Sequence, residues 1–223
     1  MRIAWRECVA ELIGTFALCF IGAGAICTDA LTRGQVGLIG IAMAHGLVLS
    51  VAVSSTMAIS GGMLNPVVTL ALKATGRIKD WNQVAQLIVA QFVGAAIAGF
   101  FLRSIYPMAV WDRVHLGTPA LGNGTTPGMG IFIEAVLTFF LLLAVFGTAV
   151  DTRAPKLGGF GIGLTIAFDI LMGGPMTGAA MNPARWFGPA LASGYWTDWH
   201  VYIIGPALGG VIAGVLYDKF LRK

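Results

Sequence analysis

The chain has 223 residues, of which 57% are hydrophobic and only 11% are charged, with a formal net charge of +4. Ordinary soluble domains carry about 25% charged residues, so too few polar side chains remain here to cover an exterior in water. The composition excludes a soluble globular domain and predicts an all-α integral membrane protein.

Six apolar segments approach the length of about 20 residues that a helix needs to cross about 30 Å of hydrocarbon. We expect membrane-spanning helices at residues 8–28, 36–59, 84–106, 128–150, 158–172 and 201–220, of which the fifth is the shortest. Six spans place both termini on one side. With the termini inside, ten Lys and Arg lie in inner segments and three in outer loops. Because basic residues gather on the cytoplasmic side, we expect both termini in the cytoplasm. We also expect the protein in the cell membrane rather than in an organelle. The positive charge therefore indicates no nucleic-acid partner.

The first and fourth spans each contain an acidic residue, followed four and five residues later by Thr-Phe. These acids are Glu11 and Glu134. Ionisable residues inside spans are functional candidates by default, which makes a proton relay one interpretation. The other is a structural acceptor for free backbone N–H groups of a nearby non-helical segment, and the matching positions favour it. Asp169 in the fifth span has no counterpart, and its role is left open.

Two short stretches resemble each other. They are Gly61-Gly62-Met63-Leu64-Asn65-Pro66-Val67 and Gly178-Ala179-Ala180-Met181-Asn182-Pro183-Ala184. Asn is favoured at a helix N-cap and Pro at the first helical position, although Asn-Pro is also an ordinary turn opener. The apolar segment after each Asn-Pro is too short to cross a bilayer. We therefore expect two half-helices of about 10–12 residues, about 15–18 Å long at 1.5 Å per residue, with N-termini that meet inside the membrane.

The acidic motif recurs after 123 residues and the Asn-Pro motif after 117. This pattern indicates an internal duplication, with one copy at about 1–106, the other at about 128–223, and an outer loop at 107–127. Each copy has three spans, an odd number, so the second copy runs inverted. We expect one transmembrane domain of six helices and two re-entrant half-helices. Four glycines of the last span, which permit close helix packing, are Gly205, Gly209, Gly210 and Gly214.

With these motifs the chain resembles the aquaporins, the major intrinsic protein family of water and small-solute channels. The motifs are Ser60-Gly61-Gly62-x-x-Asn65-Pro66-x-x-Thr69 and Thr177-Gly178-x-x-Met181-Asn182-Pro183-Ala184-Arg185-x-Phe187-Gly188-Pro189-Ala190. The resemblance implies that Glu11 and Glu134 support the loops before the half-helices. It also implies a homotetramer with one pore per subunit, in contact with membrane lipid.

We expect three groups of pore residues on this basis. The central constriction comprises Asn65, Pro66, Val67, Asn182, Pro183 and Ala184. Backbone carbonyls that accept hydrogen bonds from water come from Gly61, Gly62, Met63, Leu64, Gly178, Ala179, Ala180 and Met181. The resemblance places an outer selectivity filter at His45, Ile170, Ala179 and Arg185. A packed core histidine is the alternative for His45.

Several positions depart from the family pattern. Val67 stands where the family usually has Ala, so we expect more bulk beside the central constriction. His45 in the second span and Ile170 in the fifth resemble the plant vacuolar-membrane branch, which implies a wider filter. Ala179 replaces the Cys of mercury-sensitive members, so we expect no mercury block at this position.

The sequence thus predicts a passive channel for water, and for small neutral solutes such as ammonia or glycerol, that excludes protons and ions. One alternative is a dedicated glycerol facilitator of the same fold. The other is an ion-coupled transporter, in which Glu11, Glu134 or Asp169 would titrate. The three histidines are far apart in sequence, metal-ligand spacing is missing, and no nucleophile has a neighbouring base. We therefore expect no enzyme, no cofactor and no metal site.

Overall fold

A computed structural model describes residues 4–155 and 157–222, and every regular element in them is helical. Six helices are long and apolar enough to cross a membrane. They are α1 (Trp5–Leu31), α2 (Gly37–Thr56), α4 (Trp81–Ile105), α6 (Pro127–Val145) continued by the π-helical turn η2 (Phe146–Val150), α7 (Phe160–Thr177), and α9 (Val201–Leu216) continued by the π-helical turn η3 (Tyr217–Leu221). The predicted class, an all-α membrane protein with six spans, is confirmed.

Two shorter helices begin at the Asn-Pro motifs. They are α3 (Pro66–Ala74), with nine residues, and α8 (Pro183–Ser193), with eleven. At about 1.5 Å per residue, each covers roughly half of the hydrocarbon core. The predicted outer loop contains two further short elements, α5 (Met108–Trp111) and η1 (Asp112–Gly117).

The fifth span extends further than the sequence analysis expected. It was predicted to end at residue 172, but α7 continues through Gly173, Gly174 and Pro175 to Thr177. These residues are poor helix formers, and burial of the helix in the bundle outweighs their low propensity. The helix ends at Gly178, whose φ of 77° lies in the left-handed region, where glycine lacks the steric penalty of other residues.

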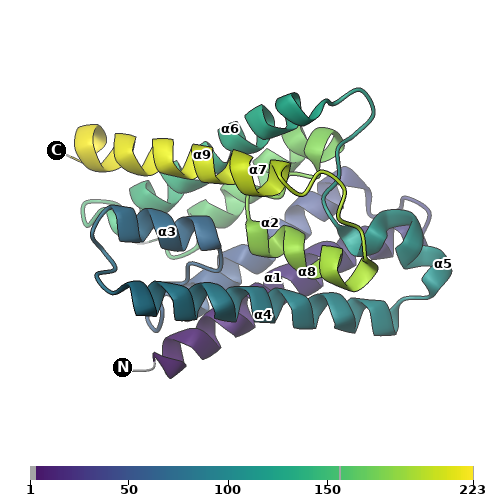
Figure 1. Cartoon of the computed structure of the whole chain (residues 1–223), viewed down its shortest axis with the longest axis horizontal. Helices are drawn as coiled ribbons and strands as arrows, with labels where there is room; N and C mark the ends of the chain where they lie inside the picture. The colour runs from purple at the N-terminus through teal and green to yellow at the C-terminus, as the bar shows by residue number, and fades with distance from the viewer. Residues whose placement is uncertain (1–3, 156, 223) are drawn as a thin grey trace.

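The two copies of the repeat pack in the same way. α1 lies along α4 in the first copy, α6 lies along α9 in the second, and α2 packs on α7 between the copies. Each half-helix packs against the last span of the other copy, α3 on α9 and α8 on α4. Figure 1 shows α3 and α8 in opposite halves of the molecule, between α4 and α9, and shows α1 beginning at the end where η3 finishes.

Glycines bring the helices of each copy close together. A Cβ atom on Gly94 of α4 would overlap the carbonyl oxygen of Leu12 on α1, and one on Gly209 of α9 would overlap that of Ala135 on α6. Gly205 likewise faces α6, while Gly210 faces Val67 of α3. The glycine face predicted on the last span is therefore used inside the protein, and it gives no argument for contacts between subunits.

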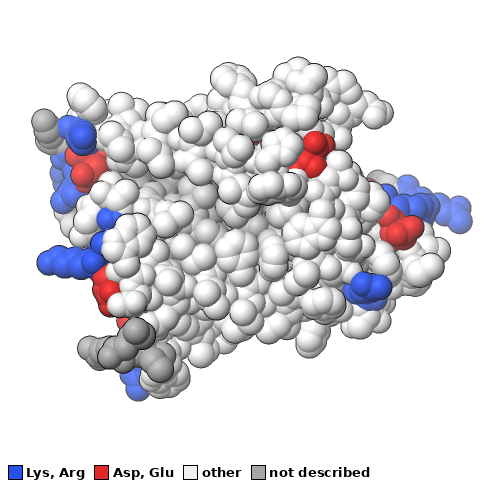
Figure 2. All heavy atoms as spheres, in the orientation of Figure 1, with Lys and Arg blue, Asp and Glu red and all other residues white. Residues whose placement is uncertain are grey.

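The surface matches a protein embedded in lipid. Figure 2 shows Lys and Arg at the two ends of the molecule, and on this face the broad band between them has none. Large apolar side chains are exposed around the spans, for example Ile39 at 71%, Val51 at 66% and Phe132 at 70%. Such exposure of apolar area is stable in hydrocarbon and would promote aggregation in water.

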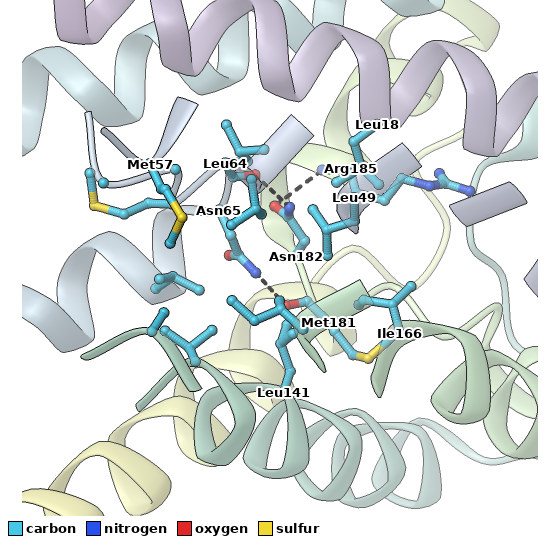
Figure 3. A pocket seen from close by; sticks show the side chains of 18 of the residues that line it. Leu18, Leu49, Met57, Leu64, Asn65, Leu141, Ile166, Met181, Asn182 and Arg185 are labelled. Atoms are coloured by element: carbon cyan, nitrogen blue, oxygen red, sulfur yellow. Dashed lines mark hydrogen bonds between the residues drawn. The ribbon is translucent and has the colours of Figure 1, made fainter. Parts of the chain in front are cut away.

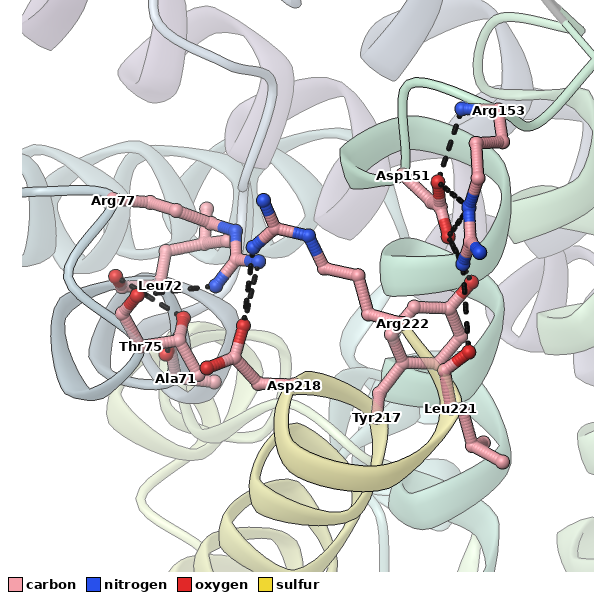
Figure 4. Close-up of polar contacts among 10 residues, drawn as sticks. All are labelled: Ala71, Leu72, Thr75, Arg77, Asp151, Arg153, Tyr217, Asp218, Leu221 and Arg222. Atoms are coloured by element: carbon pink, nitrogen blue, oxygen red, sulfur yellow. Dashed lines mark hydrogen bonds and ion pairs between the residues drawn. The ribbon is translucent and has the colours of Figure 1, made fainter.

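At the end of the molecule that holds both termini, hydrogen bonds join η3 to the loop after α3 and to the loop after η2 (Figure 4). Asp218 accepts a hydrogen bond from Arg77 Nη2 at 2.8 Å, and the Tyr217 hydroxyl donates to Asp151 at 3.1 Å.

The guanidinium of Arg153 beside Asp151 lowers the pKa of that carboxyl. A lowered pKa stabilises the fold above the unfolded value of about 3.9, and this contribution is lost only as the pH falls below it. We therefore expect the Asp151 contact to be insensitive to pH near neutrality.

Candidate functional site

A cavity of about 340 Å³ lies inside the bundle beside the beginnings of both half-helices. Its inner end, the end nearer the chain termini, is lined by Met57, Leu72 and Arg77. Its outer end, the end nearer the loop at 107–127, is lined by His45 and Arg185. A second cavity of about 320 Å³ lies beside the outer loop and is also lined by His45 and Ile170. These two side chains therefore lie between the first cavity, called the inner cavity below, and the second, called the outer cavity.

Both half-helices begin with the predicted N-cap. Asn65 and Asn182 have extended backbones, with φ of −155° and −147°, and a proline follows each of them. The Oδ1 atom of Asn65 accepts from the Val67 N–H at 2.9 Å. The Oδ1 atom of Asn182 accepts from the Ala184 N–H at 3.0 Å. The amide oxygen of each Asn is thus used for capping, and its NH₂ group is directed into the cavity.

Each Asn amide donates a hydrogen bond to the re-entrant loop of the other copy (Figure 3). Asn65 Nδ2 donates to the Met181 carbonyl at 3.0 Å, and Asn182 Nδ2 donates to the Leu64 carbonyl at 2.8 Å. Each NH₂ group has two hydrogens, so each retains one N–H beyond this contact. The paired motifs are therefore adjacent at the middle of the cavity, and each presents a fixed donor to it.

The backbone before each Asn adopts a left-handed conformation that is rare for residues other than glycine. Leu64 has φ 51° and Met181 has φ 53°, and Ala179 has φ 46°. This conformation directs the carbonyls of Leu64 and Met181 to the opposite Asn and their N–H groups away from the cavity. Strained backbone of this kind persists only where surrounding contacts hold it, and those contacts come from the two buried acids.

Glu11 and Glu134 bind the N–H groups of the two re-entrant loops. Glu11 accepts from Met63 N at 3.0 Å and Leu64 N at 2.6 Å. Glu134 accepts from Ala180 N at 2.9 Å and Met181 N at 2.7 Å. Hydroxyl groups at equivalent positions add a third bond, Ser60 to Glu11 and Thr177 to Glu134. These are the contacts expected of structural acceptors, and both carboxylates are fully buried.

At the outer end, Arg185 is buried at 3% exposure and contacts His45. His45 Nδ1 lies 2.8 Å from the Ile41 carbonyl, which can only accept, so Nδ1 carries the hydrogen. Nε2 is then free to accept from Arg185 Nε at 3.1 Å. Arg185 Nη2 donates to the Gly117 carbonyl at 3.0 Å. Among the described residues its Nη1 is buried and has no hydrogen-bond partner.

The structure changes the expectation for four residues of the central constriction. Pro66, Val67, Pro183 and Ala184 are buried, and they are not among the residues that line either cavity. Val67 points to α9, where a Cβ on Gly210 would overlap its Cγ1. The second residue of α3 therefore packs against the neighbouring span, on the side where Gly210 leaves room for it.

The predicted carbonyl segments divide between the cavities. Gly61, Gly62, Met63 and Leu64 line the inner cavity together with Ala179, Ala180 and Met181, whereas Gly178 lines the outer one. Two of these carbonyls, on Leu64 and Met181, already accept from the opposite Asn. Asp169 is 1% exposed and lines neither cavity. Within the described residues one of its carboxylate oxygens has no partner.

Two further residues hold the site and are not among the predicted site residues. Gln91 of α4 is fully buried, and its Nε2 donates to Glu11 at 2.7 Å and to Thr69 at 2.9 Å. An amide in the middle of an apolar span is a signal that could have identified it. The carbonyl of Gly117, which holds Arg185, gave no sequence signal, because any residue provides a backbone carbonyl.

Comparison with known proteins agrees with this geometry. The family model for major intrinsic proteins matches residues 2–217. Aquaporin TIP4-4 of Zea mays is 46% identical over 221 residues, which cover 96% of this chain and 85% of the relative. Aquaporin NIP1-1 of Zea mays is 37% identical, covering 98% and 76%. The X-ray structure of the aquaglyceroporin from Plasmodium falciparum has the same fold, with a TM-score of 0.83 at 23% identity over 98% of this chain and 97% of that one.

Proposed function

The chain belongs to the major intrinsic protein family, and from this premise we propose how it conducts water and small neutral solutes. Water and solute molecules pass in single file between the two Asn amides and then between His45 and Arg185. The pair of amides carries the proposal, because each is fixed by its own half-helix and by the opposite loop.

Water that enters an apolar passage must recover the hydrogen bonds it leaves behind. One free N–H on each of Asn65 and Asn182 can donate to the same water oxygen. That water then has both lone pairs occupied, and its hydrogens point to the two ends of the passage, where loop carbonyls accept neighbouring waters. A water in this orientation cannot receive a proton from the next one, so proton hopping is interrupted.

Two features repel cations. The N-termini of α3 and α8 both point at the centre, and each helix N-terminus carries roughly half a positive charge. Arg185 adds a full positive charge at the outer narrowing. An ion-coupled transporter would need an acid that is free to titrate and faces the passage. Glu11 and Glu134 use both of their oxygens to bind donors, and Asp169, the third candidate, lines neither cavity. The contacts therefore favour passive conduction.

A wider solute range is the second candidate, and the composition of the narrowing favours it. Ile170 and Ala179, both apolar, share the narrowing with the polar His45 and Arg185. A passage with one polar and one apolar side suits a molecule such as glycerol, whose hydroxyl groups and carbon chain lie on different sides.

Osmotic measurements on reconstituted vesicles test both candidates. Stopped-flow light scattering under a sucrose gradient measures water permeability, and the same vesicles under a glycerol gradient measure solute permeability. We expect fast water equilibration with weak dependence on temperature. Permeability equal to that of protein-free vesicles in both gradients would contradict the proposal, and glycerol entry as fast as water entry would favour the dedicated facilitator.

The environment of the protein is part of the proposal. We infer cytoplasmic termini from the excess of basic residues on that side, the cell membrane as the location, and a homotetramer from the family resemblance. A tag accessible only after permeabilisation tests the orientation, and imaging of the tagged chain tests the location. The mass of the detergent-solubilised particle tests the tetramer.

The Asn182→Asp variant should conduct water at least tenfold more slowly, because a barrier increase of about 1.4 kcal/mol corresponds to a factor of ten. The new carboxylate can still cap α8, but it places an oxygen against the Leu64 carbonyl where Nδ2 now donates at 2.8 Å. It also removes the donor that the passing water needs. Stopped-flow scattering measures the change.

Asn82→Asp is the matched control, since Asn82 is exposed at the start of α4. It makes the same chemical change away from the cavity and should leave the flux unaltered. Equal fluxes for both variants would count against the amide mechanism.

A further inference from the structure

Gly22 of α1 lies directly behind the imidazole of His45. A Cβ atom at this position would lie 2.5 Å from His45 Nε2 and would also overlap Cδ2. Gly22 itself is buried and lines neither cavity. The ring therefore occupies space that only a glycine at position 22 leaves open.

The position of this ring determines two properties of the narrowing. Its Nε2 accepts from Arg185 Nε at 3.1 Å, so the ring fixes one side of the guanidinium. The ring also lines both cavities together with Ile170, so its distance from Ile170 limits what can pass. A residue that determines how far the imidazole extends toward Ile170 thus determines both the width of the narrowing and the orientation of the Arg185 guanidinium.

We infer that Gly22 is a positioning residue that determines the specificity of the channel through His45. This inference rests on the proposed filter role of His45 and Arg185. The bare backbone of α1 lets the imidazole stand back from the passage. A methyl group at position 22 would displace the ring away from α1, toward the cavities that His45 and Ile170 both line. The narrowing would become smaller, and the His45–Arg185 hydrogen bond would be lost.

The test compares Gly22→Ala with Gly24→Ala on the same helix. Both changes replace a buried glycine with a better helix former. A Cβ on Gly24 would lie 3.3 Å from Leu102 Cδ2 and would not touch His45. Permeability is measured for water, ammonia and glycerol, normalised to the amount of folded channel in the vesicles. For Gly22→Ala we expect a loss that grows with solute size and reaches about tenfold for the largest solute the wild type conducts, as one methyl group can produce in a fitted site.

A second variant separates a specific effect from misfolding. In a His45→Ala background the ring is missing, so adding Gly22→Ala should change neither the permeability nor the order of solutes. If Gly22→Ala matches Gly24→Ala, or lowers all permeabilities equally in both backgrounds, the inference is wrong. If His45→Ala alone leaves the solute order unchanged while water is still conducted, then the filter proposal itself fails, and the Gly22 inference fails with it.

Discussion

The Glu134→Leu variant should not accumulate as a folded channel. Its carboxylate accepts from Ala180 N at 2.9 Å, Met181 N at 2.7 Å and the Thr177 hydroxyl at 2.7 Å. Leucine leaves all three donors without an acceptor at a depth where no water can replace it. Each buried polar group left unpaired costs about 1–3 kcal/mol, so three cost roughly 3–9 kcal/mol. A typical stability is about 5–15 kcal/mol, and the loss is therefore large enough to abolish folding.

Size-exclusion chromatography and thermal stability in detergent measure the outcome. Glu134→Gln retains one acceptor oxygen, so we expect a folded but less stable protein whose water flux per channel is close to that of the wild type. Glu7→Gln, in the first turn of α1 and only half-buried, is the control and should change nothing. A proton-relay role would give the reverse pattern, with normal stability and altered transport in Glu134→Gln. Wild-type stability in Glu134→Leu would show that the loop is held by other contacts.

The main features of the fold could be predicted because they depend on local chemistry or on repetition. Six apolar segments, two Asn-Pro caps and two acids at matching positions each have a direct physical consequence. The inverted duplication follows from an odd number of spans per copy. The family resemblance predicts Arg185 in the outer filter, and the structure shows its side chain lining the cavity together with His45.

What could not be predicted depends on which neighbours meet in three dimensions. The direction of Val67 is set by the gap at Gly210, and nothing near Val67 in the sequence indicates it. The glycines of α9 were correctly identified as close-packing residues, yet the sequence could not show that their partners are α6 and α3. Similarly, nothing near Pro175 in the sequence indicates that α7 continues through it to Thr177.

The two copies are nearly equivalent around the central amides and differ at the outer end. Ser60 and Thr177, Glu11 and Glu134, and the two Asn residues all correspond. His45 and the Gly117 carbonyl both accept hydrogen bonds from Arg185, which belongs to the second copy. The duplication therefore builds a symmetric centre, where donors converge from two sides, and the outer narrowing arises from contacts that break this symmetry.

The Arg185→Ala variant should admit cations or protons that the wild type excludes. Of the described Lys and Arg residues, Arg77 and Arg185 line the inner cavity; Arg185 is the one that contacts His45, and it is 3% exposed. At an effective dielectric constant of about 20, a unit charge about 4 Å from a passing cation contributes about 4 kcal/mol, which corresponds to roughly a thousandfold in rate. The helix N-termini at the centre remain in the variant, so the measured increase should lie between about tenfold and this limit.

Proton flux is measured with a pH-sensitive dye inside vesicles, and solute flux by light scattering on the same sample. Arg113→Ala is the matched control, because Arg113 lines the outer cavity but lies on an exposed turn. It lowers the positive charge near the outer mouth by the same amount without changing the narrowing, so ion exclusion should persist. Because loss of the Arg185 side chain also leaves the His45 Nε2 acceptor unpaired and opens space, glycerol entry should rise in Arg185→Ala and not in Arg113→Ala. If both variants still exclude protons equally, the barrier lies at the Asn65 and Asn182 amides alone, and Arg185 selects by size rather than by charge.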